Sequence, residues 1–213
     1  MSGSRTAAAL LVVYALLAAI LWRAFGTGSV APTLCGVAIA AIVLATWRRN
    51  GATPASLGLA PRTWRSGWAS AAAASLAGSA LLGVAGIATG HAAIAAARFA
   101  WLGDYAVGIA GQELLLQGFF APGFARLAAS RPPAVAIGAA ALAFAGLHAP
   151  NPGLMIGTLV AGAFWVAHFR AHRNLPAVLA SHLVLGMAAM ASLGPGPLWN
   201  LRVGAGALEL MSR

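Results

Sequence analysis

The chain has 213 residues, of which 61% are hydrophobic and only 8% are charged. Because a water-soluble domain carries about 25% charged residues, this composition excludes an ordinary soluble protein and predicts an integral membrane protein. The formal charge of +10 comes entirely from arginine, since the sequence contains no lysine. The arginines lie mostly beside apolar runs, which is typical of membrane-topology signals and lipid-headgroup contacts, so we expect no nucleic-acid partner.

The first half of the chain contains three apolar runs that can cross a bilayer, which requires about 20 mainly apolar residues in a helix. Arg48 and Arg49 end the second run. The stretch 51–67 combines prolines, arginines and tryptophans, which predicts an interfacial loop or a short surface helix. The predicted spans of this half are roughly 7–22, 30–47 and 68–90.

The second half contains four further apolar runs, one of which is unusually short. A helix over 134–148 would be about 22 Å long, less than the hydrocarbon thickness of about 30 Å. Because Pro150 and Pro152 oppose its continuation, we expect His148 to lie inside the membrane. The predicted spans of this half are roughly 105–127, 134–148, 153–169 and 175–193.

Together these runs predict an all-α integral membrane protein, a bundle of about seven transmembrane helices. We expect one domain over 1–213, with polar motifs in about 101–193 and a tail, 194–213, too short and broken to span again. More arginines fall on the side of the N-terminus than on the other side, where Arg98 and Trp101 belong. This bias predicts a cytoplasmic N-terminus.

One carboxylate, Glu113, interrupts the apolar run of the fourth predicted span, in a chain with only three acidic residues. An ionisable side chain at the centre of a membrane helix costs about 2.5–3.5 kcal/mol on insertion scales, and such residues mark functional sites. Gln112 precedes Glu113, and Gln117 lies on the same helix face because residues four apart share a face. No arginine lies nearby on this helix, so a charged partner must come from another helix.

The later spans supply further polar side chains that could meet Glu113. Phe144 and His148 share a helix face at the end of the fifth span, and His182 lies within the seventh span. Asn151 follows His148 and offers an amide close to the same place. Three separate helices are therefore predicted to converge on one polar pocket.

A carboxyl group and two imidazoles in an apolar pocket suit the activation of water, with the carboxylate as general base and the imidazoles holding the water or a developing oxyanion. Glu113, His148 and His182 could instead bind zinc, since two histidines and one glutamate form a known catalytic set. The sequence has no H-E-x-x-H spacing, and its one cysteine, Cys35, offers no thiolate site. We therefore expect no metal and no cofactor. In a purely structural alternative, these polar groups only join helices.

Three segments resemble, in order and spacing, the motifs of the CPBP family of glutamic-type intramembrane proteases, which includes CAAX prenyl proteases and bacteriocin-processing-like proteins. Residues 112–118 resemble Glu-Glu-x-x-x-Arg-Gly, 144–148 resemble Phe-x-x-x-His, and 182–186 resemble His-x-x-x-Asn or Asp. The resemblance covers roughly 101–193. It implies an intramembrane endopeptidase from a divergent bacterial branch, in the bacterial plasma membrane, acting on a membrane-anchored protein or peptide.

The chain departs from the family pattern at three positions. Gln112 stands where the family has its first glutamate, the usual catalytic base; Gln117 replaces the arginine, and Gly186 replaces the terminal Asn or Asp. A strict transfer of the family's residues therefore predicts an inactive protein. Glu113, however, remains beside the altered position.

Our working hypothesis is that Glu113 acts as the base while His148 and His182 bind the water and the oxyanion. The supporting residues are Gln112, Gln117, Asn151 and Phe144. The main alternative is a non-catalytic membrane scaffold or immunity protein that kept the bundle and lost the chemistry. A small-solute transporter is a weaker alternative, because the sequence shows no inverted repeat.

Overall fold

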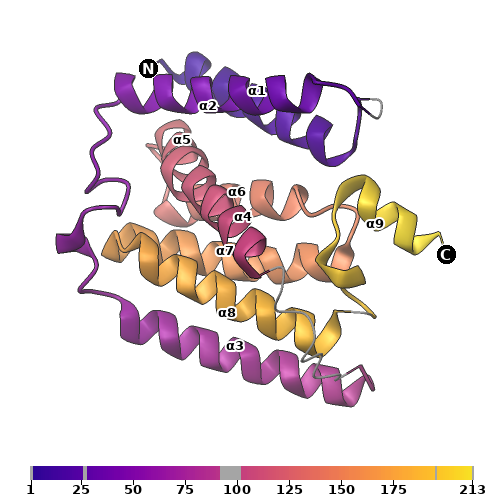
Figure 1. The fold of residues 1–213 in the computed structure, drawn as a ribbon. Coiled ribbons are helices and arrows are strands. Elements are labelled where there is room, and N and C mark those ends of the chain that lie inside the picture. Colours follow the sequence, from indigo (N-terminus) through magenta and orange to yellow (C-terminus); the bar gives the residue numbers. More distant parts are fainter. Residues whose placement is uncertain (1, 26–27, 92–101, 195, 213) are drawn as a thin grey trace.

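The protein is described here by a computed structural model covering residues 2–25, 28–91, 102–194 and 196–212. Within these ranges every regular element is a helix (Figure 1). The connection at 92–101, which holds Arg98 and Trp101, lies outside the described residues.

The helices match the predicted spans in position. Helices long and apolar enough to cross a membrane are α1 (Gly3–Leu21), α2 (Ala31–Arg49), α3 (Trp68–Ala88), α7 (Pro152–His172) and α8 (Leu175–Leu193). A further helix is divided into α4 (Leu102–Leu115), the π-helical turn η3 (Leu116–Phe120) and α5 (Ala121–Leu127), which follow one another without a break. Helix α6 (Pro133–Gly146) is apolar but shorter, as expected from Pro150 and Pro152, which follow it. The prediction of an all-α membrane bundle is confirmed.

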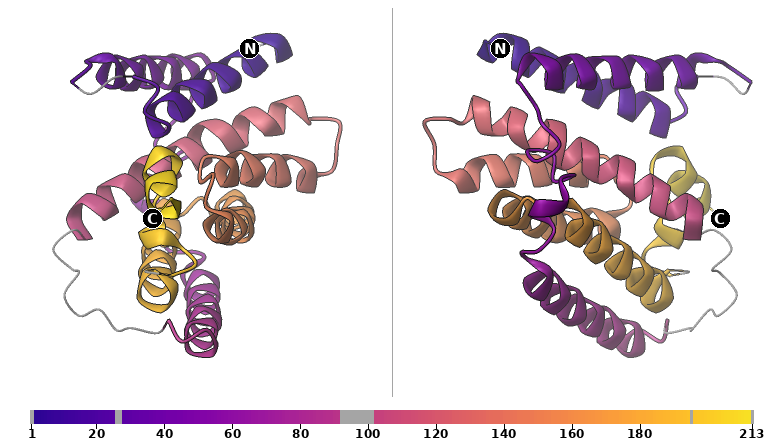
Figure 2. Two further views of the ribbon diagram at one scale, coloured as in Figure 1. Left: turned by 90° about the vertical axis from the view of Figure 1, so that its right-hand side faces the viewer. Right: turned by 60° about the vertical axis from the view of Figure 1, so that its left-hand side comes forward.

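The continuous α4–η3–α5 segment lies at the centre of the bundle. Helices α1 and α2 form a pair at one side, and α3 packs along α8 at the other (Figure 1). The central segment contacts both groups, because α5 packs against α1 and α6 while α4 packs against α8. Figure 2 shows the same order from two further directions. The fold therefore carries Glu113 to the middle of the molecule.

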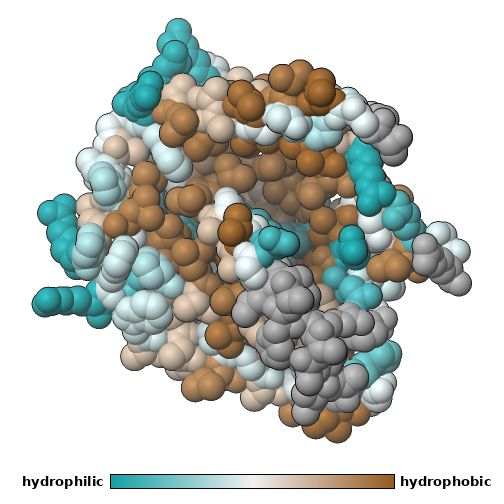
Figure 3. Space-filling model, viewed as in Figure 1, coloured by the Kyte–Doolittle hydropathy of each residue, from teal (hydrophilic) through white to brown (hydrophobic). Residues whose placement is uncertain are grey.

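The outer surface of the bundle is apolar, as a lipid-facing surface requires. Side chains such as Leu11 and Val107 are 70% and 74% exposed on the outer faces of their helices. In Figure 3, hydrophobic residues cover much of the middle of the view, and hydrophilic residues gather mainly towards its left and right ends. These two ends are the ends of the long helices, so the bundle axis runs across the view.

The interfacial stretch 51–67 is held against the bundle by a buried asparagine. The stretch consists of turns with one short 3-10 helix, η1 (Pro61–Thr63). Asn174, which is fully buried, accepts a hydrogen bond from Ala177 N at 3.0 Å and so caps α8. Its amide nitrogen donates to the carbonyls of Trp64 at 2.9 Å and Ser66 at 2.7 Å.

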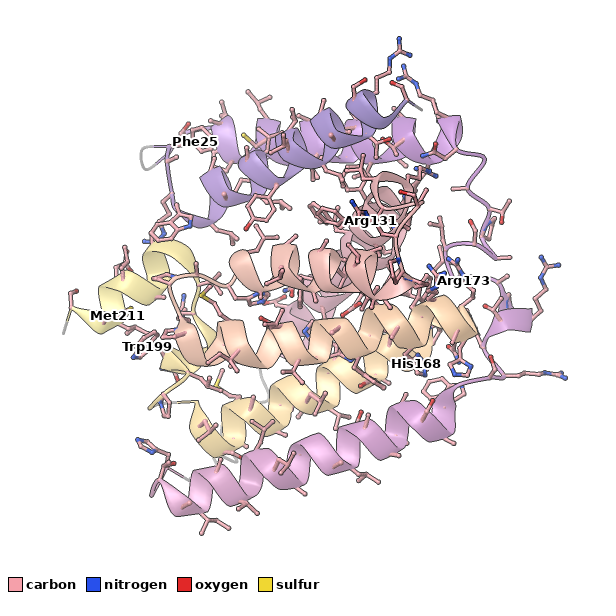
Figure 4. All side chains as sticks on the ribbon, turned by 180° about the vertical axis from the view of Figure 1, so that it is seen from behind. Phe25, Arg131, His168, Arg173, Trp199 and Met211 are labelled. Atoms are coloured by element: carbon pink, nitrogen blue, oxygen red, sulfur yellow. The ribbon has the colours of Figure 1, made fainter. Side chains whose placement is uncertain are left out.

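The tail forms a 3-10 turn, η4 (Trp199–Leu201), and a short helix, α9 (Gly204–Met211), which packs against α1. Trp199 and Met211 lie at the opposite end of the bundle from Arg173 (Figure 4). The tail thus lies at the end of the bundle away from the N-terminus (Figure 1).

Replacing Asn174 should separate its two roles. Asn174→Ala loses a helix cap and leaves two carbonyls without their donor, so we expect the free energy of unfolding to fall by about 2 kcal/mol. Asn174→Ser keeps a capping oxygen without adding a charge, so its free energy of unfolding should fall by less. Unfolding by SDS titration in mixed micelles measures both; equal stability of Asn174→Ala and wild type would contradict this account.

Candidate active site

Glu113 lies fully buried at the centre of the bundle, with a hydrogen bond to each carboxylate oxygen. Its Oε1 lies 2.8 Å from His182 Nδ1 on α8. Its Oε2 accepts from Gln117 Nε2 at 2.9 Å, one turn along the same helix. The exposed fractions of Glu113 and Gln117 are 0% and 2%. Because a buried carboxylate must be paired, these two donors offset the free-energy cost of burying it.

The π-helical turn η3 shapes the segment that carries Gln117. A π turn displaces the following residues relative to a regular helix, and such turns are frequent at functional sites. The indole Nε1 of Trp47 on α2 donates to the Gly118 carbonyl at 2.7 Å. A Cβ atom on Gly118 would lie 2.9 Å from Trp47 Cζ2, so the close approach of α2 requires glycine.

The imidazole of His182 is held by an aromatic ring as well as by Glu113. Trp165 of α7 stacks on it with a ring-centroid distance of 4.1 Å and an interplanar angle of 18°. The Trp165 indole donates to Ser181 Oγ at 3.1 Å, and Ser181 Oγ lies 2.9 Å from Ser75 Oγ on α3. Three helices therefore fix the orientation of His182.

Sequence analysis missed this group of Trp165, Ser181 and Ser75. One signal was available: Trp165 lies in the interior of a predicted span, whereas tryptophan in membrane proteins favours the interfaces. The pairing itself could not be found, because Ser75 and Ser181 are distant in the sequence.

His148 lies just after the end of α6, close to the Glu113 and His182 pair but not bonded to it. Its Nδ1 donates to the Phe144 carbonyl at 2.8 Å. Since a carbonyl only accepts, Nδ1 carries the hydrogen, and Nε2 of the neutral ring is an acceptor. The Phe144 ring contacts both imidazoles, with centroid distances of 4.7 Å to His148 and 6.0 Å to His182.

A cavity of about 140 Å³ adjoins His148 at the tail end of the bundle. Gln112, Phe144 and Val203 also line it, and its other walls are apolar. Gln112 Oε1 is buried and has no hydrogen-bond partner within the described residues. We call this space the His148 cavity. Its polar lining residues are His148 and Gln112.

A second cavity, of about 170 Å³, lies towards the opposite end of the bundle. Its lining includes Trp47, Gln117, Arg126 and Arg173. Gln117 Oε1 is also buried without a partner in the described part of the chain. Glu113 lines neither cavity; it lies between two glutamine residues that each line one.

Two other predicted or substituted positions have clear structural surroundings. Asn151 is fully buried and caps α7 by accepting from Leu154 N at 3.0 Å. Its amide nitrogen donates to the Leu198 carbonyl at 2.8 Å, so its contacts join the His148 turn to the tail. At Gly186, a Cβ atom would overlap the Tyr105 hydroxyl. A larger residue at Gly186 would therefore displace Tyr105.

No group of three or more His, Cys, Asp or Glu side chains in the described ranges is arranged to hold a metal ion. Glu113 and His182 are in contact, but His148 directs Nδ1 to a backbone carbonyl. The zinc alternative therefore has no ligand set among the described residues.

Substitution of Glu113 should distinguish its hydrogen bonds from its charge. Glu113→Ala leaves donors of His182 and Gln117 unpaired in an apolar interior, so we expect the free energy of unfolding to fall by about 2 kcal/mol or more. In Glu113→Gln, the new amide oxygen accepts from His182, and the Gln117 amide can rotate to accept from the new amide nitrogen. That variant should lose less than about 1 kcal/mol. SDS titration in mixed micelles tests both, and an Ala variant as stable as wild type would contradict the bonding.

Comparison with known proteins assigns the motif-bearing part of the chain. Residues 94–188 match the family model described as type II CAAX prenyl endopeptidase Rce1-like. No curated protein and no solved structure matches the chain in these comparisons. The matched segment contains Glu113, His148 and His182. The match supports CPBP family membership for the segment 94–188 of this integral membrane protein, a segment similar to CAAX-type membrane endopeptidases.

Proposed function

We propose that this protein is an intramembrane endopeptidase that hydrolyses a peptide bond of a membrane-anchored protein or peptide. The observation that carries the proposal is the buried contact of Glu113 with His182, beside a cavity lined by His148. A carboxylate, two imidazoles and room for water can supply the general acid–base catalysis by which a peptide bond is hydrolysed without a covalent intermediate. The Rce1-like family match supports the same class of reaction.

The geometry favours His148 over Glu113 as the group that takes the proton from water. Glu113 is fully buried, and both of its carboxylate oxygens already accept hydrogen bonds. His148 lines a cavity, and its Nδ1 bond to Phe144 leaves Nε2 as the acceptor. We assign Glu113 to His182, whose ring the carboxylate orients through Nδ1.

The proposed reaction proceeds in two steps. Water in the His148 cavity attacks the carbonyl carbon of the scissile bond and gives one proton to His148 Nε2, while the imidazole of His182, oriented by Glu113, stabilises the oxyanion by hydrogen bonding. His148 then gives this proton to the leaving nitrogen as the carbon–nitrogen bond breaks, which yields a carboxylic acid and an amine. Gln112, which lines the same cavity, accepts a hydrogen bond from the O–H that remains on the attacking oxygen.

The supporting residues act on these three. Gln117 holds Glu113 from the second oxygen, and Phe144 spaces the two imidazoles. Asn151 fixes the turn that follows His148. The arginine bias supports a cytoplasmic N-terminus in a bacterial plasma membrane. The tail and the His148 cavity then lie towards the non-cytoplasmic side.

A non-catalytic scaffold or immunity protein is the second candidate. The specific observation in its favour is that both carboxylate oxygens of Glu113 are occupied by donors, an arrangement that also suits a structural joint between α4 and α8. The substitutions at Gln112, Gln117 and Gly186 agree with it. In this case the same side chains stabilise the bundle and no peptide bond is cleaved.

Mapping of new protein termini tests the proposal and does not require the substrate to be identified first. Membranes from cells that express the wild-type protein should contain new protein termini that are produced by cleavage. In cells that express His148→Ala or His182→Ala, the abundance of these termini should be lower by about 100-fold or more, the usual effect of losing an acid–base or oxyanion group. Glu113→Gln should lose them too, although it retains the fold.

A matched histidine variant provides the control. His172→Ala removes an imidazole at the other end of α7, beside His168, and should leave the termini unchanged. If cells that express wild type and cells that express Glu113→Gln contain the same new termini in the same amounts, the protein is not a peptidase of this kind and the scaffold alternative holds.

A further inference from the structure

The C-terminal tail lies directly against the His148 cavity. The left panel of Figure 2 looks onto this end of the bundle and shows α9 and the chain before it across the middle of the view. Val203, between η4 and α9, is one of the residues that line the cavity, together with Gln112 and His148. The tail therefore supplies part of the wall of the candidate active site.

The tail is extended where it reaches the cavity wall, as a bound peptide often is. Arg202 has φ −72° and ψ 147°, and Val203 has φ −130° and ψ 164°. Gly204 N donates to the Ala149 carbonyl at 2.8 Å, and the Arg202 carbonyl accepts from Asn151 Nδ2 at 3.2 Å. Hydrogen bonds on both sides of Val203 thus tie the tail to the turn that follows His148.

We propose that the tail occupies the peptide-binding cleft of the active site and competes there with substrate, an inference that rests on the proposed peptidase function. Extended peptides commonly bind by main-chain hydrogen bonds, with alternate side chains in pockets. Here Val203 takes the place of a substrate side chain. The cleft accepts an aliphatic side chain, because its apolar lining consists of Leu17, Leu21, Leu115, Leu116, Phe120 and Leu147.

The contacts that hold the tail show how it can be released. Gly204 has φ +55°, and a Cβ atom there would overlap the Leu21 carbonyl oxygen at the end of α1. Farther along, Arg23 and Glu209 form an ion pair with exposed side chains. An exposed ion pair contributes little to stability. The tail is therefore fitted closely at Gly204, and the ion pair adds only a little to the attachment of α9.

Cysteine accessibility measures the position of the tail directly. In a Cys35→Ser background, Leu147→Cys places a single thiol on the cavity wall, and a polar maleimide reports its exposure in the purified protein. Adding Gly204→Val should speed labelling by about tenfold or more, because a side chain there forces the tail away. Adding Glu209→Gln should speed it by about 2- to 5-fold, the effect of losing an exposed ion pair.

A second arm measures the effect on cleavage with the native Leu147. Release of the tail by Gly204→Val or Glu209→Gln should increase the new termini in membranes. A peptide that spans residues 198–206 should slow labelling of the Gly204→Val protein, whereas the same peptide with Val203→Asp should not. Leu208→Gln, which changes an exposed residue of α9, is the matched control and should alter neither readout.

The two readouts separate failure of this inference from failure of the proposed function. Unchanged labelling in both tail variants overturns the inference, even if wild type produces termini. If the tail variants are labelled faster but neither they nor wild type produce new termini, the peptidase function is overturned, and the tail is only a cover of the cavity. Faster labelling with fewer termini also overturns the inference, because the tail would then assist cleavage.

Discussion

The hydrogen bonds of the buried Glu113 carboxylate are the constraint on which the centre of this bundle depends. In the absence of water, a carboxylate must be surrounded by donors or carry a proton. His182 and Gln117 provide the donors, so α8 must pack closely against α4, and the Gln117 side chain must lie along the same helix face as Glu113. The packing of α7 follows, because the Trp165 ring stacks on His182. One acidic group thereby organises several helices that are otherwise simple apolar spans.

The π-helical turn reconciles this bonding with the approach of α2. A wider turn leaves the Gly118 carbonyl available to Trp47, and only glycine permits that contact. Gln112 and Gln117, on either side of Glu113, each retain a buried oxygen without a protein partner in the described structure, and each lines a cavity. Burying a polar atom without a hydrogen bond is unfavourable. Each glutamine therefore combines a buried, unpaired oxygen with a place on a cavity wall.

The early end of α6 gives His148 its place. Pro150 and Pro152 end this helix inside the bundle, so the imidazole lies on a turn that can meet the centre of the molecule and the tail at once. The same turn binds the tail through Ala149 and Asn151. A tail that is too short to cross the membrane thus forms part of the wall of the His148 cavity.

Composition and hydropathy alone determined the membrane class, the positions of the spans and the short fifth helix, because these depend on local sequence and on the fixed thickness of a bilayer. The isolated position of Glu113 in an apolar run also marked it as important, and the motif spacing indicated the CPBP family. Tertiary structure alone decided which groups meet. It paired Glu113 with His182, directed the Asn151 amide to the tail and placed Trp165, Ser181 and Ser75 behind His182. These contacts depend on the rotation and tilt of helices distant in sequence, and apolar periodicity hardly restricts rotation when both the core and the lipid-facing surface are apolar.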